Sequence, residues 1–426
     1  MIIRNSHLID PKSGTDGARD IRINDENGTI SDISTAGTLM PENEEEVIDA
    51  DGIMAVPGLV DGHVHFRDPG FTDKEDIMTG ACAAAAGGFT SVVMMANTNP
   101  PIDNRETLEY VIAKGRETGL HLYSSANVTA GINGSELTDM ETLSECGAVA
   151  FTDDGRPIND EGLLRKALLA AEKIRKPISL HEEDPAYITQ NGINDDIAQS
   201  AFGLKGSPRA AEISMICRDV NIARDYGADL LIQHISTAEG VELVRRARKE
   251  GIHVHAEATP NHFTLTQDDV PKHMTLAKIN PPLRTEHDRL AIIEGLKNGT
   301  IEMIATDHAP HTRAEKSQPI TVAPSGIIGL ETSFSLGLRE LVNKGYITFA
   351  ELIRKMSMNP AAFFHLDAGY IAVGGPADIT LIDVNAEWTV SDHFRSKASN
   401  SPYIGEKMPG RIIRTICAGK TVFRAE

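Results

Sequence analysis

The chain has 426 residues, 41% hydrophobic and 24% charged, which is typical of a globular protein with one large α/β barrel or two to three ordinary domains. Its 61 acidic and 41 basic side chains give a formal net charge of -20, which argues against non-specific binding to nucleic acid or anionic membrane. The four cysteines form no CxxC pair, and no stretch has the ~20 apolar residues of a membrane span or the core of a signal peptide, so we expect a cytoplasmic protein with reduced thiols.

Short β-like pieces occupy the first 53 residues, and a different pattern follows from residue 54 to residue 364. There, apolar strand-like runs alternate with segments of helical spacing such as EGLLRKALLAAEKIRK and AEGVELVRRARKEG. The strand-like runs are MAVPGLVDGHVHF, TSVVMMANTNP, HLYSSANVT, AVAFTDDG, PISLHEED, DLLIQHIST, IHVHAEATP and IEMIATDHAPH. Eight such repeats in series predict a (β/α)8 TIM barrel.

A doubly wound open sheet is the alternative fold, but no GxGxxG or GxxxxGK[ST] element follows the first strand. From residue 365 to residue 426 the chain is again β-like, in ADITLIDVN, EWTV and RIIRTICAGKTVF. We therefore predict three segments. Residues 1–53 and 365–426 together form a small β-sandwich domain, and residues 54–364 form the catalytic barrel.

His63 and His65 end the first barrel strand. Side chains at i and i+2 of a strand point to the same face, so both imidazoles can reach one metal ion. A lone His-x-His pair is a weak signal, because two ordinary polar residues near a loop give the same pattern.

Four later strands also end in histidine or aspartate. These residues are Asp154 in the fourth run, His181 in the fifth, His234 in the sixth and Asp307 in the eighth. Taken singly, each has an ordinary explanation, such as an Asp-Gly turn or a core histidine. In a barrel, however, all five strand ends converge on one mouth, where four imidazoles and two carboxylates are sufficient ligands for two zinc ions. Zinc-activated water with Asp307 as acid and base would hydrolyse an amide-like bond, or form one.

Eight motifs together resemble one known family, the class I dihydroorotases of the amidohydrolase superfamily. They are PGLVDGHVHFRDPG (57–70), MANTNP (95–100), FTDDG (151–155), LHEED (180–184), QHIST (233–237), NPPLR (280–284), TDHAPH (306–311) and PSGIIGLET (324–332). The resemblance implies the reversible cyclisation of N-carbamoyl-L-aspartate to (S)-dihydroorotate and water, a step of pyrimidine biosynthesis.

The resemblance also implies roles for single residues. His63, His65 and Asp307 would hold the first zinc, and His181 and His234 the second, with Asp154 rather than Asp153 bridging them. Asp307 would be the catalytic acid and base. The substrate would be bound by Arg67, Asn97, Asn280 and His311, with the backbone near residues 324–326 facing its ring. From the residues alone, Arg67 offers a planar fork for a carboxylate, or a surface salt bridge with Asp68.

The fourth strand discriminates among relatives, because hydantoinases and dihydropyrimidinases usually carry a carboxylated lysine there and AVAFTDDG has none. An allantoinase or hydantoinase type of amidase is the alternative function. An inactive barrel that serves as a scaffold for aspartate transcarbamoylase is a further alternative, disfavoured because all six ligand positions are filled. Besides the small-molecule substrate, the resemblance allows a homodimer and an association with aspartate transcarbamoylase.

Two other clusters are assigned no catalytic role. The second His-x-His pair, His253 and His255 on the seventh strand, is expected to pack or to form hydrogen bonds in the barrel. The Glu182–Glu183 pair is expected to be solvated or to cap a helix.

Overall fold

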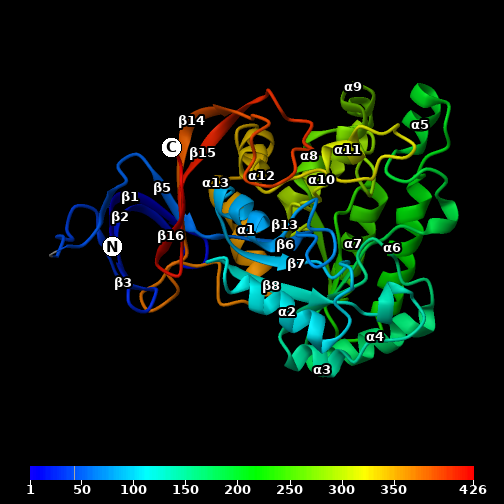
Figure 1. The fold of residues 1–426 in the computed structure, drawn as a ribbon, viewed down its shortest axis with the longest axis horizontal. Helices are drawn as coiled ribbons and strands as arrows, with labels where there is room; N and C mark the ends of the chain where they lie inside the picture. Colours follow the sequence, from blue (N-terminus) through cyan, green and yellow to red (C-terminus); the bar gives the residue numbers. More distant parts are fainter. Residues whose placement is uncertain (43) are drawn as a thin grey trace.

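The computed structural model describes residues 1–42 and 44–426, which form a large β/α barrel and a smaller β domain at its side (Figure 1). The blue N-terminal strands and the red C-terminal strands lie together in the smaller domain, which contains both chain ends (Figure 1). The predicted fold class, a TIM barrel with a small β domain built from both termini, is confirmed. The three segment boundaries stay predictions.

The barrel is an eight-stranded parallel sheet whose strands follow one another in chain order. Its strands are β6 (Leu59–Val64), β7 (Phe89–Met94), β8 (His121–Ala126), β9 (Ala148–Thr152), β10 (Ile178–Leu180), β11 (Leu230–Ile232), β12 (Val254–Ala258) and β13 (Met303–Ile304). A bridge between Val64 and His308 joins the first strand to the segment after the last, so the ring closes at the carboxyl ends of the strands. Seven of these strands lie within the predicted runs, and β7 begins one residue before its run, at Phe89.

The first of those runs is split between the two sheets. We expected one strand within residues 54–66, but β5 (Met54–Pro57) pairs with β1 and β14 of the smaller domain, and only β6 enters the barrel. Gly58 separates the two strands, and an added Cβ there would lie 2.1 Å from Thr90 Oγ1. The close approach of Thr90 therefore requires glycine at the point where the chain passes from one sheet to the other.

Helices and short turns connect the strands and cover the barrel. The α-helices are α1 (Ile77–Ala86), α2 (Arg105–Gly115), α3 (Met140–Glu145), α4 (Glu161–Ile174), α5 (Asp195–Phe202), α6 (Arg209–Ala223), α7 (Ala238–Lys249), α8 (Pro260–Thr264), α9 (Val270–His273), α10 (Glu286–Asn298), α11 (Arg313–Lys316), α12 (Ser333–Gly337), α13 (Phe349–Ile353) and α14 (Asn359–Phe363). The 3-10 turns are η1 (Ala130–Ile132), η2 (Pro185–Tyr187), η3 (Gln267–Asp269) and η4 (Met274–Ala277), and two π-helical segments are η5 (Leu338–Val342) and η6 (Arg354–Met358).

The two helices predicted from their spacing, α4 and α7, form where expected. In α7 the buried residues Val241, Val244 and Ala247 recur every third residue, so they form a stripe that packs against the barrel. Asp160 accepts a hydrogen bond from the Leu163 N–H and caps the start of α4.

The smaller domain is a mixed sheet in which three C-terminal strands lie beside the N-terminal strands. Its strands are β1 (Ile2–Asp10), β2 (Thr15–Asn24), β3 (Thr29–Thr35), β4 (Val47–Asp49), β5, β14 (Ile379–Thr389), β15 (Lys407–Cys417) and β16 (Lys420–Arg424). They follow the order β16-β15-β14-β5-β1-β2-β3, with β4 beside β1. Because β5 pairs with β14, the N-terminal and C-terminal halves depend on each other for their hydrogen bonds.

A polar cluster joins the smaller domain to the amino ends of the barrel strands. Nε2 of His121, at the start of β8, lies 3.0 Å from Asp378 Oδ2, and the Ala418 N–H donates to Asp378 Oδ1 at 2.7 Å. The Cys417 thiol donates to Thr90 O at 3.6 Å. The hydrogen bond to Asp378 raises the pKa of His121, so a charged imidazole is favoured at this junction. These contacts link the two parts of the molecule, which indicates a structural role.

The second His-x-His pair lies at the amino end of β12, at the opposite end of the barrel from His63 and His65. His255 Nδ1 lies 2.8 Å from Glu302 Oε2, and its Nε2 lies 3.4 Å from Asp229 Oδ1. Burial alone would lower the pKa of His255, but its bonds to Asp229 and Glu302 raise the pKa to about 9. His253 Nδ1 also lies 3.3 Å from Asp229 Oδ1, so both histidines contact a carboxylate here.

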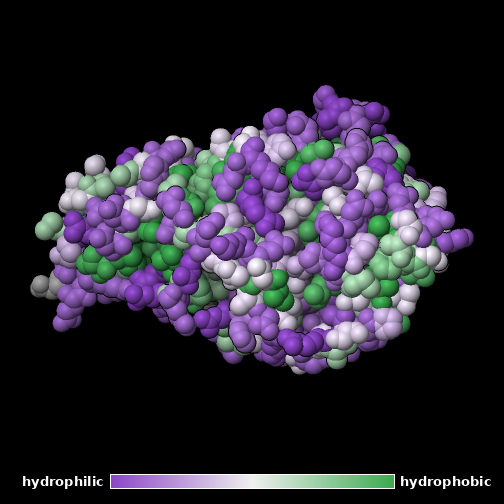
Figure 2. Space-filling model, turned by 90° about the horizontal axis from the view of Figure 1, so that it is seen from above, coloured by the Kyte–Doolittle hydropathy of each residue, from purple (hydrophilic) through white to green (hydrophobic). Residues whose placement is uncertain are grey.

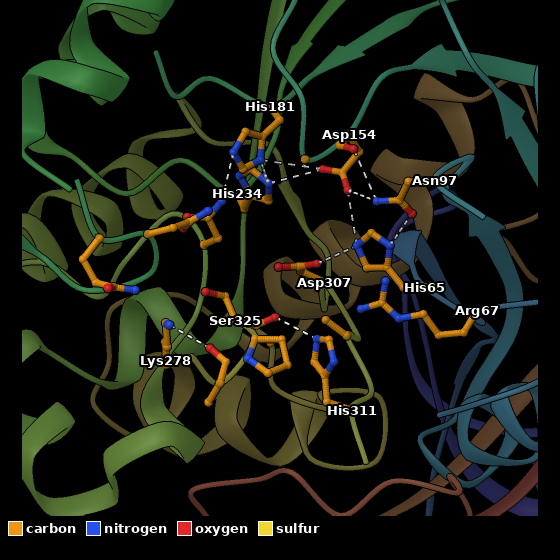
Figure 3. Close-up of a pocket in the computed structure, with 18 of the residues that line it drawn as sticks. His65, Arg67, Asn97, Asp154, His181, His234, Lys278, Asp307, His311 and Ser325 are labelled. Carbon is orange, nitrogen blue, oxygen red and sulfur yellow. Dashed lines mark hydrogen bonds and ion pairs between the residues drawn. The ribbon is translucent and has the colours of Figure 1, made fainter. Parts of the chain in front are cut away.

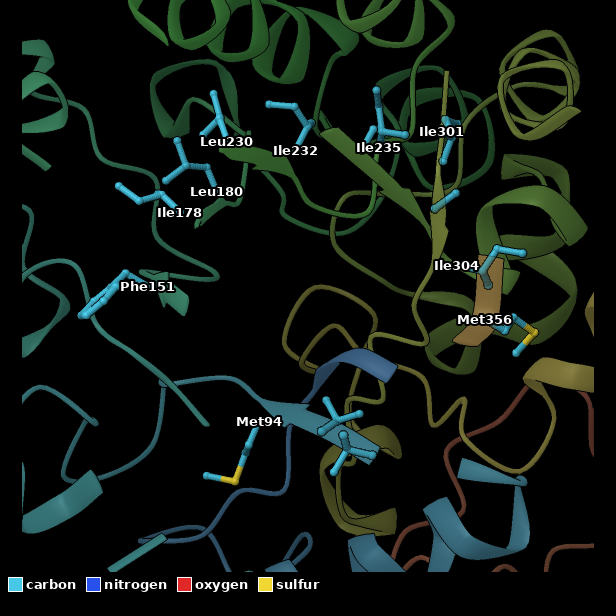
Figure 4. Packing of buried hydrophobic residues seen from close by; sticks show 14 of the residues in the cluster. Met94, Phe151, Ile178, Leu180, Leu230, Ile232, Ile235, Ile301, Ile304 and Met356 are labelled. Carbon is cyan, nitrogen blue, oxygen red and sulfur yellow. The ribbon is translucent and has the colours of Figure 1, made fainter. Parts of the chain in front are cut away.

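Apolar side chains from most barrel strands form one continuous core. Figure 4 shows part of it, with Met94 from β7, Phe151 from β9 and Ile304 from β13 arranged around the barrel. The surface seen in Figure 2 is mostly hydrophilic, with separate small apolar patches over both parts of the molecule. Within residues 1–42 and 44–426, no helix is long and apolar enough to span a membrane.

Candidate metal centre and cavity

Six polar side chains meet where five barrel strands end, and Figure 3 labels all of them except His63. His63 is the last residue but one of β6 and His65 directly follows the strand, whereas the others come just after β9, β10, β11 and β13. Those others are Asp154, His181, His234 and Asp307. The structure thus brings together all six side chains that the sequence singled out as ligands, because the carboxyl ends of parallel strands share one mouth of the barrel.

Asp154 lies at the centre of this cluster. Its Oδ1 is 3.6 Å from Nε2 of both His63 and His234, and 3.8 Å from His181 Nδ1. Its Oδ2 is 3.4 Å from His65 Nε2. Two overlapping groups of three ligands therefore share this one carboxylate.

Asp153, its neighbour, points elsewhere. Its Oδ1 accepts hydrogen bonds from the Val128 and Thr129 N–H groups at 2.9 and 3.1 Å, and its Oδ2 accepts one from the Thr129 hydroxyl. Asp153 therefore fixes the loop after β8, and only Asp154 faces the histidines.

Asp307 lies against the first two histidines. Its Oδ1 is 3.0 Å from His65 Nε2 and 3.5 Å from His63 Nε2, and the residue also lines the cavity. Asp307 has a φ of 47° and His234 a φ of 33°, values that residues other than glycine rarely adopt. Such backbone strain collects at functional sites, where the surrounding structure holds it in place.

In three of the four histidines the ring nitrogen that faces away from the cluster has an oxygen partner, whereas His234 Nδ1 has none within the described residues. His63 Nδ1 donates to Glu257 Oε1 at 2.7 Å, His65 Nδ1 donates to Asn97 Oδ1 at 3.0 Å, and His181 Nε2 lies 3.3 Å from Glu183 Oε2. Such partners fix the tautomer and the orientation of a metal-binding imidazole. They leave Nε2 of His63, Nε2 of His65 and Nδ1 of His181 facing inwards.

The role of Glu183 and Glu257 as partners of the histidines was not predicted from the sequence. We expected Glu182 and Glu183 to be solvated or to cap a helix, but each is only 2% exposed. Glu183 follows His181 by two residues, so both side chains lie on one side of the extended chain, and this spacing could have revealed the pair. Glu257 gave no such local signal, because its partner His63 is far away in the sequence.

The hydrogen bonds in the cluster also indicate that it can hold metal ions, independently of its residue types. Nε2 of His63 is fully buried and has no hydrogen-bond partner within the described residues. His181 Nδ1 and His234 Nε2 face each other at 3.1 Å beside a carboxylate. Burial alone would raise the pKa of Asp154, but the surrounding histidines hold its pKa well below the ordinary value. Converging lone pairs around an ionised carboxylate are what a divalent metal requires, so the cluster could hold metal.

The cluster opens into a cavity of about 440 Å³. Arg67 and His311 lie side by side at its wall, with the guanidinium of Arg67 pointing inwards (Figure 3). Arg67 Nε donates to Pro310 O at 3.3 Å, so an interior contact replaces the surface salt bridge with Asp68 that the sequence also allowed. Burial, together with the nearby charge of Arg67, lowers the pKa of His311 to about 3. His311 is therefore neutral at pH 7, and Arg67 provides the positive charge that suits an anion on this side of the cavity.

The two asparagines predicted to bind substrate contact the metal-binding cluster directly. Asn97 Nδ2 donates to Asp154 Oδ2 at 3.0 Å while its carbonyl accepts from His65, so Asn97 connects two candidate ligands. Asn280 Nδ2 lies 3.3 Å from His181 Nε2, and its buried Oδ1 has no partner within the described residues. Both asparagines also line the cavity.

Solved structures with this architecture include hydantoinases. The chain superposes on the L-hydantoinase (dihydropyrimidinase) from Arthrobacter aurescens with a TM-score of 0.86 and 25% identity, covering 99% of this chain and 95% of the other. A D-hydantoinase (dihydropyrimidinase) from Thermus sp., at 21% identity, shares the fold with a TM-score of 0.85 over 99% and 95% of the two chains. The barrel and its His/Asp cluster define the class of protein: a cyclic amidohydrolase.

The sequence relatives narrow this class to one family. The chain is 47% identical to the dihydroorotase of Clostridioides difficile (strain 630) over 426 residues, 100% of each chain. It is 49% identical to the dihydroorotase of Streptococcus pyogenes serotype M3 over 424 residues, 99% of each. The family described as Dihydro-orotase-like matches residues 52–240. The chain belongs to the dihydroorotase family.

Proposed function

We propose that this protein interconverts N-carbamoyl-L-aspartate and (S)-dihydroorotate in pyrimidine biosynthesis. The observation that carries the proposal is the His/Asp cluster and the guanidinium of Arg67 in one cavity. A cyclic amide with a carboxylate substituent needs both features: a site that attacks the ring carbonyl and a cation that holds the carboxylate. Dihydroorotate has this chemistry, whereas hydantoin lacks the carboxylate.

Two zinc ions are the cofactors that we assign to this cluster. His63, His65 and Asp307 would hold one, His181 and His234 the other, and Asp154 would be shared by both. When bound, zinc lowers the pKa of water to about 7 and polarises a carbonyl oxygen. Glu257, Asn97 and Glu183 would keep the histidines oriented towards the ions.

Asp307 is the acid and base of the reaction that we propose. In ring opening, water adds to the ring carbonyl carbon and the bond from that carbon to the ring nitrogen breaks. Asp307 takes a proton from the attacking water and delivers it to the departing nitrogen. In ring closure the same carboxylate removes the proton from the carbamoyl nitrogen and returns it to the leaving water.

The carboxylate contact leads to a prediction for Arg67. Replacing Arg67 with Ala should raise KM for dihydroorotate by about 10- to 100-fold, the loss expected for a charge-assisted hydrogen bond, with kcat changed much less. Steady-state kinetics in both directions measures the effect. Arg313→Ala is the control, because Arg313 is exposed on α11, and its KM should equal that of the wild type. An unchanged KM for Arg67→Ala would show that Arg67 does not bind the substrate carboxylate.

A substrate panel tests the function as a whole. Zinc-loaded protein is incubated with dihydroorotate, hydantoin and allantoin, and ring opening is followed. We expect turnover of dihydroorotate. Turnover of hydantoin or allantoin without dihydroorotate would instead support the second candidate, which the structural similarity to hydantoinases favours. The absence of lysine in residues 148–155, where hydantoinases usually carry a carboxylated lysine, counts against that candidate.

The cellular location and the protein partners of the enzyme are also proposals. We place it in the cytoplasm, with a homodimer and an association with aspartate transcarbamoylase as its protein contacts. Light scattering of the protein alone, and then mixed with aspartate transcarbamoylase, tests both contacts.

A further inference from the structure

One wall of the cavity is a loop, residues 320–326, that we call the cavity loop. Residues 321–326 all line the cavity. The loop belongs to no helix or strand. The Val322 and Ala323 N–H groups donate to Pro319 O in a turn, but most carbonyl groups of the loop accept hydrogen bonds from side chains around it.

Two buried lysines supply most of these contacts. Lys278, which follows η4, donates from Nζ to Ile320 O and Ala323 O, both at 2.7 Å. Lys316, the last residue of α11, donates from Nζ to Pro324 O at 3.0 Å and to Gly326 O at 2.9 Å. Four carbonyl groups of the cavity loop are thus held by two ammonium groups.

Neither lysine has a carboxylate partner within the described residues, although each is at most 5% exposed. Lysine is almost never buried so fully without such a partner, because the ammonium group loses its hydration. Burial lowers the pKa of Lys278 to about 8, and burial together with the charge of Lys278 lowers that of Lys316 to about 7. Two lysines lose their hydration in this way, and the ammonium groups of both donate to carbonyl groups of the same loop.

The cavity loop also reaches the carboxylate side of the site. His311 Nε2 donates to Ser325 O at 2.9 Å, so the loop fixes the ring that lies beside Arg67. The Gly326 N–H donates to Lys278 O at 2.9 Å, which ties the same loop to the segment that carries Asn280. A shift of the loop would therefore move two residues that we assign to substrate binding.

We propose that Lys278 and Lys316 are positioning residues, which hold the cavity loop and, through it, His311 in the arrangement that receives the substrate. This inference rests on the proposed function for its substrate, but the tether between the lysines and the loop is a property of the free protein. Neither lysine forms a hydrogen bond with a candidate metal ligand, although Lys278 also lines the cavity.

The test replaces Lys316 with Met, which keeps the length of the side chain and removes the donor. We expect KM for dihydroorotate to rise about tenfold or more while kcat changes less, because the loop binds substrate and transition state alike. Hydrogen exchange of the amides in residues 320–326 should quicken by about tenfold or more in the absence of substrate. The zinc content should equal that of the wild type.

Lys355→Met is the matched control. Lys355 is also buried, also has a lowered pKa, of about 8, and donates to a backbone carbonyl, that of Ile301, at 3.0 Å, but it lies outside the cavity. This variant should lose stability without a change in KM or in the exchange of the loop. Lys316→Gln keeps a neutral donor and should restore part of the KM; it also replaces the Met variant if that protein does not fold.

Unchanged exchange in residues 320–326 for both Lys316 variants would overturn the proposal, as would effects no different from those of Lys355→Met. If the wild type did not turn over dihydroorotate, the proposed function would fail, and the exchange measurement, which needs no substrate, would still decide whether the lysines hold the loop.

Discussion

Replacing Asp307 with Asn should lower kcat for dihydroorotate by about a thousandfold or more, with the fold intact. Asparagine has nearly the same shape but cannot accept the proton of the attacking water, and acid–base catalysis by a positioned side chain contributes about 10²–10⁴-fold. The effect should appear in both directions, because the same carboxylate carries the proton in each. Steady-state rates of ring opening and ring closure measure it.

Two controls separate a lost proton carrier from a damaged site. At saturating zinc, where His63, His65 and Asp154 would still hold the first ion, the zinc content of Asp307→Asn should match that of the wild type, and its free energy of unfolding should stay close to the wild-type value. Asp61→Asn makes the same exchange at a nearby buried carboxylate, which accepts hydrogen bonds from the Thr306 and His63 N–H groups and lies outside the cavity. Its kcat should fall far less. Near-normal turnover by Asp307→Asn with zinc bound would refute the role of Asp307 as acid and base.

The strand order and the convergence of the six side chains could be predicted from the sequence because both follow from a repeating pattern. Once eight parallel strands close into a barrel, every residue that directly follows a strand lies at the same mouth. His63 and Asp307, far apart in the chain, come within 3.5 Å for this reason alone. The distances and the central position of Asp154 needed the structure.

Other parts of the site could not be predicted from the sequence. Glu257 contacts His63 across the barrel, and the pairing depends on the direction of two side chains on strands that are not neighbours. Lys278 and Lys316 contact backbone carbonyls, which are the same for every residue type, so no pattern of side chains marks the loop they hold. The split of residues 54–66 into β5 and β6 depended on pairing with β14, near the other end of the chain.

The second large effect is expected for zinc binding when Asp154 is replaced. Its neighbour Asp153 is expected to have a different role. Asp154→Asn should lower zinc affinity by about a hundredfold or more and abolish most turnover, since its carboxylate faces four histidines and an amide is a poor metal ligand. Zinc content after dialysis against a chelator, measured by elemental analysis, reports this loss without reference to activity.

Asp153→Asn supplies the contrast, with the same chemical change one residue away. Asp153 accepts hydrogen bonds from the backbone of Val128 and Thr129 and from the Thr129 hydroxyl. Its amide variant should lose about 1–3 kcal/mol of unfolding free energy and keep its zinc, because a buried set of donors loses a charged acceptor while the metal-binding cluster is untouched. Zinc loss in Asp153→Asn with retention in Asp154→Asn would reverse the assignment, because the shared ligand must be the carboxylate whose removal releases the metal.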